Sequence, residues 1–529
     1  MQTMLKETKN LGQYFTPEHV ADFMIGLSSV SRNAKILEPA CGEGIFLKLL
    51  EEKGYKNALG YEIDKTLRAV AKSKILFESF VSADIKERFD LIIGNPPYIR
   101  WKNLNQALKE ELASNLLWQR YFNSLCDYLC IFVLKSIELL KENGELIFIT
   151  PEYWINTKHA QILRNYLTKS GYFTNIIHFN ETPIFDKVAS SILIFKFIKS
   201  SNSEARVQSI KVIKYLSTQR LTQETLSKIK NNTPDKRIEA FERNQFGLNE
   251  SWVLAPSRVG KKLEKYENEC VTTVSSTLFG DERRYNTLGD IADIGNGMVS
   301  GLDRAFQIPK ESRLTAKERR ATISVLKAKN MERYVHGDIT SYIFLNGDVR
   351  NENDLKEKYP TFYELLRQFQ EKLEQRYDYN RKINYWEWVF LRSFNLFRQE
   401  KEKIFVPCKE RISHKNYFRF SYVPSGIFPT QDVTAVFLKS GVKESIYYIL
   451  ALLNSEHVFE WLKHKGVVKG NIVEFSEKPL ASIPVRLIDW ENPVEVELHK
   501  EISLSCQNYI LTKDQKSLLD LKEKMSVLF

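Results

Sequence analysis

The four residues Asn95-Pro96-Pro97-Tyr98 have the types and the order needed to hold a planar amine. Consecutive prolines stiffen the backbone, so the Asn95 side chain and the Pro96 carbonyl become fixed acceptors for the two hydrogens of one NH2 group. Acceptors that draw these N–H bonds out of plane localise the nitrogen lone pair toward an electrophile. Tyr98 adds a flat face, and stacking of a base on such a face is worth about 1–3 kcal/mol. Taken alone, the segment suits the amine of adenine, the N4 amine of cytosine or a glutamine side chain.

Acidic residues precede this segment, each at the end of an expected strand. Glu38 is followed by Gly42 and Gly44, whose lack of a side chain lets a ligand approach the backbone. Because no Gly-Lys-Ser/Thr ending follows and Glu38 would repel a phosphate, a cationic ligand such as the methionine part of S-adenosylmethionine fits better. Glu62 comes 24 residues later, where dinucleotide-binding folds grip ribose hydroxyls. Asp84 is placed to accept a hydrogen bond from the adenine amine of the cofactor.

Residues 34–200 alternate strands and helices, a pattern typical of a parallel sheet covered on both faces. In such sheets ligands bind at the carboxyl ends of the strands, so the acids and Asn95 are expected to meet in one cleft. We therefore predict an α/β, Rossmann-like domain over residues 1–200. The expected strands are Lys35–Glu38, Ala58–Glu62, Phe80–Asp84, Phe89–Gly94, Glu145–Thr150 and Ser190–Phe197, and a helix is expected at Tyr128–Leu140.

The pattern changes after residue 200. We interpret residues 201–275, which are polar and weakly periodic, as a linker, and residues 276–529 as a second domain without internal repeats. Residues 376–419 hold 11 Lys/Arg against 5 Asp/Glu, interleaved with aromatics, as expected of a surface that grips phosphates and reads base edges. Two glycine-containing loops, 295–301 and 463–470, are expected near the same ligand. The predicted DNA-binding residues are Arg381, Lys382, Arg392, Lys465 and Lys469.

The composition narrows the class of protein. Of 529 residues, 43% are hydrophobic and 27% charged, a mix that fills the cores of two or three soluble domains. A net charge of +11 favours a polyanionic partner. The six cysteines form neither a Cys-x-x-Cys pair nor a cluster with zinc-ligand spacing, so we expect no metal and no disulfides. No stretch of about 18 apolar residues occurs, and we expect a cytoplasmic protein.

Four motifs together resemble those of the TaqI-like, γ-class DNA adenine-N6 methyltransferases of type II restriction-modification systems: residues 13–17 (Gln-Tyr-Phe-Thr-Pro), 38–42 (Glu-Pro-Ala-Cys-Gly), 62–64 (Glu-Ile-Asp) and 95–98. The resemblance is close over residues 12–200. It implies a class I S-adenosylmethionine-dependent methyltransferase domain followed by a mixed α+β target-recognition domain at residues 276–529. It also implies methyl transfer to the N6 amine of an adenine flipped out of duplex DNA.

The resemblance also assigns roles to single residues. Phe15 and Thr16 enclose the cofactor, and Phe185 packs against the flipped base, although its spacing is a residue or two shorter than in the family. A hydrophobic anchor for its loop is the alternative role of Phe185. The predicted catalytic residues are Asn95, Pro96, Pro97, Tyr98 and Phe185. The predicted cofactor-binding residues are Phe15, Thr16, Glu38, Ala40, Gly42, Glu62, Ile63, Asp84 and Pro97.

Other functions share parts of this pattern. Asn-Pro-Pro-Tyr also serves enzymes that methylate RNA bases or glutamine side chains of proteins, although these seldom need a long C-terminal region. A cytosine-C5 methyltransferase would need a Pro-Cys nucleophile, and Pro407-Cys408 lies far from the cofactor motifs, at the end of an expected strand. An inactive DNA-binding module would not need an intact catalytic segment. The expected partner is double-stranded DNA, with the chain acting as a monomer and any cognate restriction endonuclease encoded separately.

Overall fold

Two compact units make up the chain, and each is described by itself. The first comprises residues 1–260 with 469–471, and the second residues 261–468 with 472–529. The computed structural model describes residues 14–124, 126–185, 191–202, 204–250, 252–277, 280–345, 347, 349–376, 383–412, 415–469 and 471–529.

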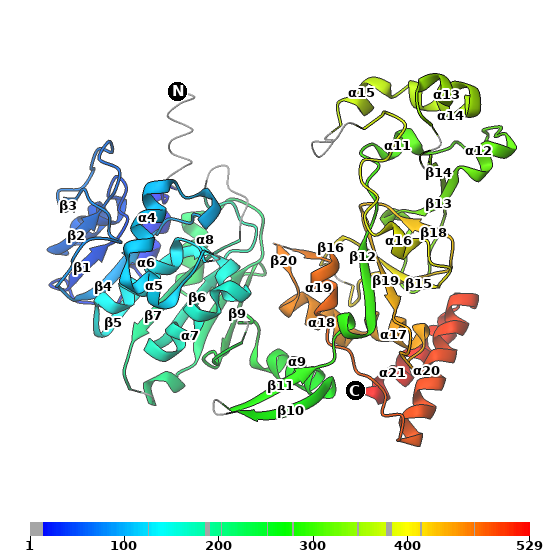
Figure 1. Ribbon diagram of the computed structural model, residues 1–529. Helices are drawn as coiled ribbons and strands as arrows, with labels where there is room; N and C mark the ends of the chain where they lie inside the picture. The colour runs from blue at the N-terminus through cyan, green and yellow to red at the C-terminus, as the bar shows by residue number, and fades with distance from the viewer. Residues whose placement is uncertain are drawn as a thin grey trace. The chain divides into compact units, whose positions relative to one another are not determined.

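One mixed sheet organises the first unit (Figure 1). The pairs β1–β2, β2–β3, β1–β4 and β4–β5 are parallel, whereas β7 runs antiparallel to both β5 and β6. The α/β class predicted for this half is therefore confirmed. In the order in which they lie side by side, the described strands are β3 (Lys74–Leu76), β2 (Asn57–Tyr61), β1 (Lys35–Glu38), β4 (Phe89–Gly94), β5 (Leu140–Pro151), β7 (Ile192–Lys199), β6 (Gly171–His178), β8 (Ile210–Tyr215) and β9 (Ile238–Arg243).

The central strands are apolar on both faces because helices cover both sides of the sheet. Neighbouring residues alternate between two cores: Leu37 packs on one side and Ile36 on the other. One core is covered by α4 (Gln106–Ser114), α5 (Leu116–Tyr121), α6 (Leu129–Leu139) and α7 (Gln161–Ser170), which Figure 1 shows in front of the sheet. The opposite core is covered by α2 (Glu18–Ile25), α3 (Ile45–Glu52) and α8 (Gln223–Lys230).

The sheet extends beyond residue 200, where a linker over residues 201–275 was expected. β8 pairs in parallel with β6, and β9 pairs antiparallel with β8. β9 is the edge strand and exposes much of its length, so its sequence lacks the apolar run that marks a buried strand. The first unit accordingly continues to Gly260, and the predicted boundary at residue 200 falls within it.

The third strand also differs from the prediction. β3 covers Lys74–Leu76, and the expected strand Phe80–Asp84 is instead a turn. This turn is held by side chains from distant helices: Lys135 on α6 donates to three of its carbonyls, and Asn115 donates to the carbonyl of Val81. Such long-range contacts leave no local pattern in the sequence, and the apolar pair Phe80-Val81 therefore suggested a strand.

The second unit combines small sheets with helices around its own core. Its helices include α9 (Ser257–Glu269), α13 (Glu352–Lys358), α14 (Pro360–Arg367), α17 (Ile446–Leu453), α18 (Glu456–Lys465), α20 (Pro493–Thr512) and α21 (Gln515–Leu528). Its principal sheet is formed by β12 (Ala292–Asn296), β19 (Val433–Leu438), β15 (Lys403–Pro407) and β17 (Ser421–Val423). The remaining strands form the sheet β14 (Thr340–Ile343), β13 (Thr322–Leu326) and β18 (Ile427–Pro429), the sheet β16 (Lys409–Arg411), β21 (Ile472–Glu474) and β20 (Val468–Lys469), and the hairpin β10 (Val271–Thr277) and β11 (Gly280–Tyr285). None of the helices in the described residues is both long and apolar enough to cross a membrane.

A buried ion pair joins β5 and β7 inside the first unit. The Lys196 ammonium lies 2.8 Å from the Glu145 carboxylate, and Ser28 and Ser29 donate to the same carboxylate. Replacing Lys196 with Met leaves this carboxylate buried and without its cation. We expect this to lower the free energy of unfolding of the first unit by about 3–5 kcal/mol. Chemical denaturation followed by circular dichroism measures this free energy of unfolding. The double variant Lys196→Met/Glu145→Gln is expected to regain part of the lost stability.

Candidate active site

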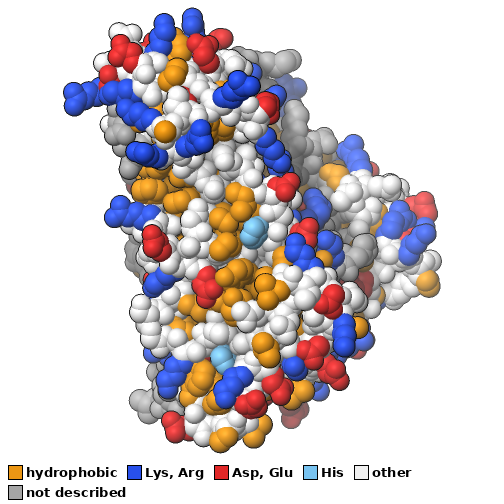
Figure 2. Space-filling view, turned by 90° about the vertical axis from the view of Figure 1, so that its right-hand side faces the viewer, with side chains coloured by type: hydrophobic (Ala, Val, Ile, Leu, Met, Phe, Trp, Pro, Cys, Tyr) orange, Lys and Arg blue, Asp and Glu red, His pale blue; other side chains and the backbone are white. Residues whose placement is uncertain are grey.

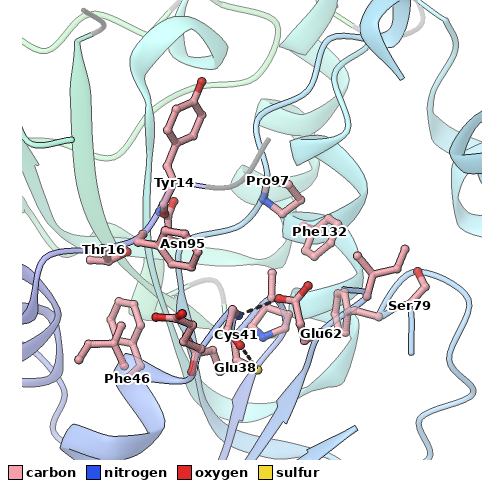
Figure 3. A pocket seen from close by; sticks show the side chains of 18 of the residues that line it. Tyr14, Thr16, Glu38, Cys41, Phe46, Glu62, Ser79, Asn95, Pro97 and Phe132 are labelled. Carbon is pink, nitrogen blue, oxygen red and sulfur yellow. Dashed lines mark hydrogen bonds between the residues drawn. The ribbon is translucent and has the colours of Figure 1, made fainter. Parts of the chain in front are cut away.

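A cavity of about 450 Å³ lies at the carboxyl ends of β1, β2 and β4 (Figure 3). Figure 3 shows Thr16, Phe46 and Glu38 on one side of it, Phe132 and Ser79 on the other, and Glu62 between them. The strand ends meet here because these strands are parallel, as predicted. The predicted site residues that line the cavity are Phe15, Thr16, Glu38, Ala40, Gly42, Glu62, Ile63, Asn95 and Pro97.

Glu38 supplies a buried negative group to the cavity. Its side chain is almost completely buried, and its Oε2 atom has no hydrogen-bond partner. Burial raises the pKa of this carboxyl well above its usual range; a backbone hydrogen bond opposes this rise, and the nearby Glu62 adds to it. A carboxylate in this state is stabilised by a cation that reaches it inside the cavity.

The loop after β1 bends around the cavity. Gly42 and Gly44 have φ angles of +54° and +86°, in the left-handed region that glycine adopts without strain. The Gly42 amide donates to Glu62 Oε2 at 2.7 Å, and the Asp64 amide donates to Glu62 Oε1 at 2.8 Å. These two bonds fix the Glu62 carboxylate at the wall, where its remaining lone pairs are placed to accept from hydroxyl groups.

Asn95 has its amide orientation set by its neighbours. Its Nδ2 donates to the Tyr14 carbonyl at 2.8 Å, which leaves Oδ1 as the acceptor, and Oδ1 takes a hydrogen bond from the Tyr98 hydroxyl. Tyr98 also contacts the Ile149 carbonyl, at 3.0 Å. Burial raises the pKa of Tyr98 well above its usual value, so its hydroxyl stays protonated and donates. The acceptor needed to hold an amine is thus present and oriented.

Three aromatic rings gather beside Asn95. The Tyr14 and Tyr98 rings are stacked with their centroids 6.0 Å apart, and Phe185 lies 6.0 Å from Tyr14. Phe185 is buried and belongs to the core around α2 and α8, so both roles considered for it, packing against a base and anchoring its loop, fit its position. Pro96 is buried and, like Tyr98 and Phe185, lies outside the set of residues that line the cavity.

Asp84 does not reach the cavity. Its side chain is exposed and pairs with Lys86 at 2.8 Å. The turn that replaces the expected strand instead brings Ser79 and Phe80 to the wall. Sequence reasoning also missed Tyr128, the N-cap of α6, and Phe132 on α6, because an apolar helix next to a cavity has the same pattern as one in a core. Their spacing of four residues on one helix face was the available signal.

The predicted DNA-binding residues belong mostly to the second unit. Arg381 and Lys382 lie outside the described residues, as does the side chain of Lys469, and Arg392 is partly exposed. Lys465 forms an ion pair within the second unit: its ammonium lies 2.8 Å from both carboxylate oxygens of Glu267. The pair forms because α18 and α9 lie against each other, a contact between segments distant in sequence. Within the described ranges, no group of three or more His, Cys, Asp or Glu side chains could hold a metal ion.

The family model of the Eco57I restriction-modification methylase matches residues 43–185, which include Glu62 and residues 95–98. The structure of the type IIL restriction-modification enzyme MmeI in complex with DNA shares the fold, with a TM-score of 0.58 at 12% identity over 97% of this chain and 71% of that one. The family model thus matches the part of the chain that carries the cavity, and the comparison with the MmeI structure shows a shared fold.

Two curated relatives define the family more closely. The type II methyltransferase M.HindII of Haemophilus influenzae is 44% identical over 96% of this chain and 95% of its own length. M.HincII of the same species is 42% identical over the same shares. The chain belongs to the type II DNA methyltransferases of restriction-modification systems, which depend on S-adenosylmethionine.

The residues of the cavity fit this cofactor. The unpartnered Glu38 oxygen suits an ammonium group, and Glu62 suits ribose hydroxyls. The exposed apolar side chains of Phe15, Ile63 and Val70 form walls that an adenosyl group would cover.

Replacing Glu38 with Gln tests this fit. The change keeps the shape of the side chain and removes its charge, so we expect the dissociation constant for S-adenosylmethionine to rise about tenfold or more. Because the pKa of Glu38 is raised in the free protein, wild-type affinity should fall as pH is lowered through that raised value, whereas affinity of Glu38→Gln should not follow this titration. Isothermal titration calorimetry over a pH series measures both. Equal affinities of the two proteins at neutral pH would contradict the assignment.

Proposed function

We propose that the protein transfers a methyl group from S-adenosylmethionine to the N6 amine of an adenine flipped out of duplex DNA. The observation that carries this proposal is the fixed amide of Asn95, a residue that lines the cofactor cavity and whose orientation makes Oδ1 the acceptor. The family acts on DNA, and a base within a duplex reaches such an acceptor only after rotation out of the helix.

On this proposal the amine replaces the Tyr98 hydroxyl as the donor to Asn95 Oδ1. The Pro96 carbonyl accepts the second N–H, and the two acceptors localise the lone pair on nitrogen. When bound, S-adenosylmethionine supplies an electrophilic methyl group. Tyr98 and Phe185 offer aromatic faces to the base, and the Tyr14 ring between their positions must shift to admit it.

Cofactor binding is assigned to residues of two kinds. Glu38 takes the methionine ammonium, and Glu62, held by the Gly42 and Asp64 amides, takes the ribose hydroxyls. We assign the adenine end to the Ser79 and Phe80 turn, because Asp84 lies on the surface.

The second unit is assigned to recognition of the DNA site. Among the side chains drawn in colour, Figure 2 shows Lys and Arg mixed with Asp and Glu over one face of this unit. This mixture is not the continuous basic track that grips a phosphate backbone, so this face is not where we place the DNA. The aromatic and basic segment 376–419, with Arg381, Lys382 and Arg392, remains our proposed contact. We propose that the loop with Lys469 also contacts the DNA.

We also propose that the chain acts as a monomer, with a restriction endonuclease encoded separately. The support is that one chain holds both the catalytic unit and a second unit large enough to choose a site.

Replacing Asn95 with Ala removes the acceptor while keeping Glu38, Glu62 and the Ser79 and Phe80 turn, which we assign to the cofactor. We expect the rate of methyl transfer at saturating substrates to fall by at least roughly 10²–10³-fold, with DNA and cofactor affinity largely kept. Tritium transfer from labelled S-adenosylmethionine to duplex DNA, RNA and protein measures it, followed by nucleoside analysis for N6-methyladenine.

Tyr98→Phe is the matched control for this variant. It keeps the aromatic face and loses only the hydroxyl that the substrate amine displaces, so its rate should stay within about tenfold of wild type. Label found in RNA or in glutamine, or normal turnover by Asn95→Ala, would reject the proposed function.

A further inference from the structure

Lys135 is a buried lysine that the proposed reaction does not use. It lies on α6, one turn after Phe132, which lines the cavity, and only 9% of its surface is exposed. Its ammonium donates to the carbonyls of Phe80 at 2.6 Å, Val81 at 3.0 Å and Ala83 at 2.6 Å. An ammonium has three N–H bonds, so each is matched by one carbonyl of the same turn.

The turn that Lys135 holds forms one wall of the cofactor cavity. Phe80 lines the cavity, its ring centroid lies 5.2 Å from that of Phe132, and the Lys135 ammonium lies 5.1 Å from the Phe80 ring. Asn115 adds a second anchor, donating to the Val81 carbonyl at 2.9 Å. Among the described residues, the turn has no neighbouring strand whose amides could donate to these three carbonyls. Because the carbonyls point at one place, a single cation with several N–H bonds meets their need for donors.

We infer that Lys135 is a positioning residue for cofactor binding, which shapes the wall formed by Ser79 and Phe80. The inference rests on the proposed function only in taking S-adenosylmethionine as the ligand of the cavity. Lys135 touches no substrate; it acts through the backbone of the turn, which would otherwise sample conformations that leave the adenine end of the cavity open.

The charge of Lys135 can be titrated near neutral pH. Burial lowers the pKa of Lys135 to about 8, against the opposing attraction of Glu111, Asp84 and Glu78, which are the acidic groups facing it from α4 and the turn. As pH rises through this value the ammonium becomes an amine with two N–H bonds for three carbonyls. The hydrogen bonds from Lys135 to the turn should therefore weaken as pH rises.

The first experiment compares Lys135→Met with Lys199→Met. Lys199 is a matched control because its ammonium also donates to backbone carbonyls, of Glu138 and Leu140, but away from the cavity. We expect Lys135→Met to raise KM for S-adenosylmethionine and Kd for S-adenosylhomocysteine about tenfold, with kcat at saturating cofactor within about twofold. Lys199→Met should leave both constants unchanged.

The second experiment needs no variant. Methylthioadenosine carries the adenine, ribose and thioether of the cofactor without its ammonium, so its binding reports the adenine end free of titration at Glu38. Its affinity for the wild-type protein should fall about fivefold between about pH 7 and about pH 9. The affinity of Lys135→Met should stay constant over this range.

These outcomes separate the inference from the proposed function. If neither S-adenosylhomocysteine nor methylthioadenosine binds the wild type, the proposed function fails and the inference with it. If both bind wild type and Lys135→Met equally, only the inference fails. If Lys135→Met does not fold, the wild-type pH series decides, and a flat profile overturns the inference.

Discussion

β1 and β4 pair in parallel with Leu37 opposite Ile92, and this register puts Glu38 beside the residues that end β4. A Cβ added to Gly94 would stand 3.4 Å from Glu38 Cγ, so the backbone that leads into Asn95 passes directly against the buried carboxylate. A shift of β1 by one residue would turn the Glu38 side chain to the other face of the sheet, away from Asn95. The group that we assign to the cofactor cation and the group that we assign to the target amine are thus placed by one pair of strands.

The same closeness has an electrostatic consequence. Glu38 is buried, lacks a partner at Oε2 and lies near Glu62, a combination that disfavours its charged form in the free protein. Two other buried charges of the first unit have partners: Lys196 has Glu145, and Lys135 has three carbonyls. The contrast supports our proposal that the cation of a bound ligand becomes the partner of Glu38, since a bound cation, like protonation, relieves the cost of the buried charge.

Much of the candidate site could be predicted from the sequence because its parts have local signatures. Glu38, Gly42, Glu62 and Asn95 each follow a short apolar strand, and parallel strands bring their carboxyl ends together. Where a side chain is positioned by contacts with a segment far away in the sequence, its place could not be predicted in this way. Ser79 enters the wall, in place of Asp84, because a helix more than 50 residues further along the chain holds its turn. Lys465 pairs with Glu267 for the same reason, and the edge strand β9 joins the sheet through a pairing with β8 that its polar sequence does not predict.

The two ends of the cofactor cavity therefore differ in the interactions that fix their walls. At the Glu38 end, the wall is made by adjacent strands and a glycine loop, so its shape follows from backbone pairing in the sheet. At the Ser79 end, the wall is an irregular turn whose carbonyls depend on one ammonium and one amide from α6 and the start of α5. Regular pairing spreads a perturbation over many bonds, whereas a turn with few anchors responds to each of them. Changes that leave the fold intact should thus act first on the Ser79 end of the cavity. The Glu38 end and the Asn95 acceptor share the β1–β4 pairing and should change together.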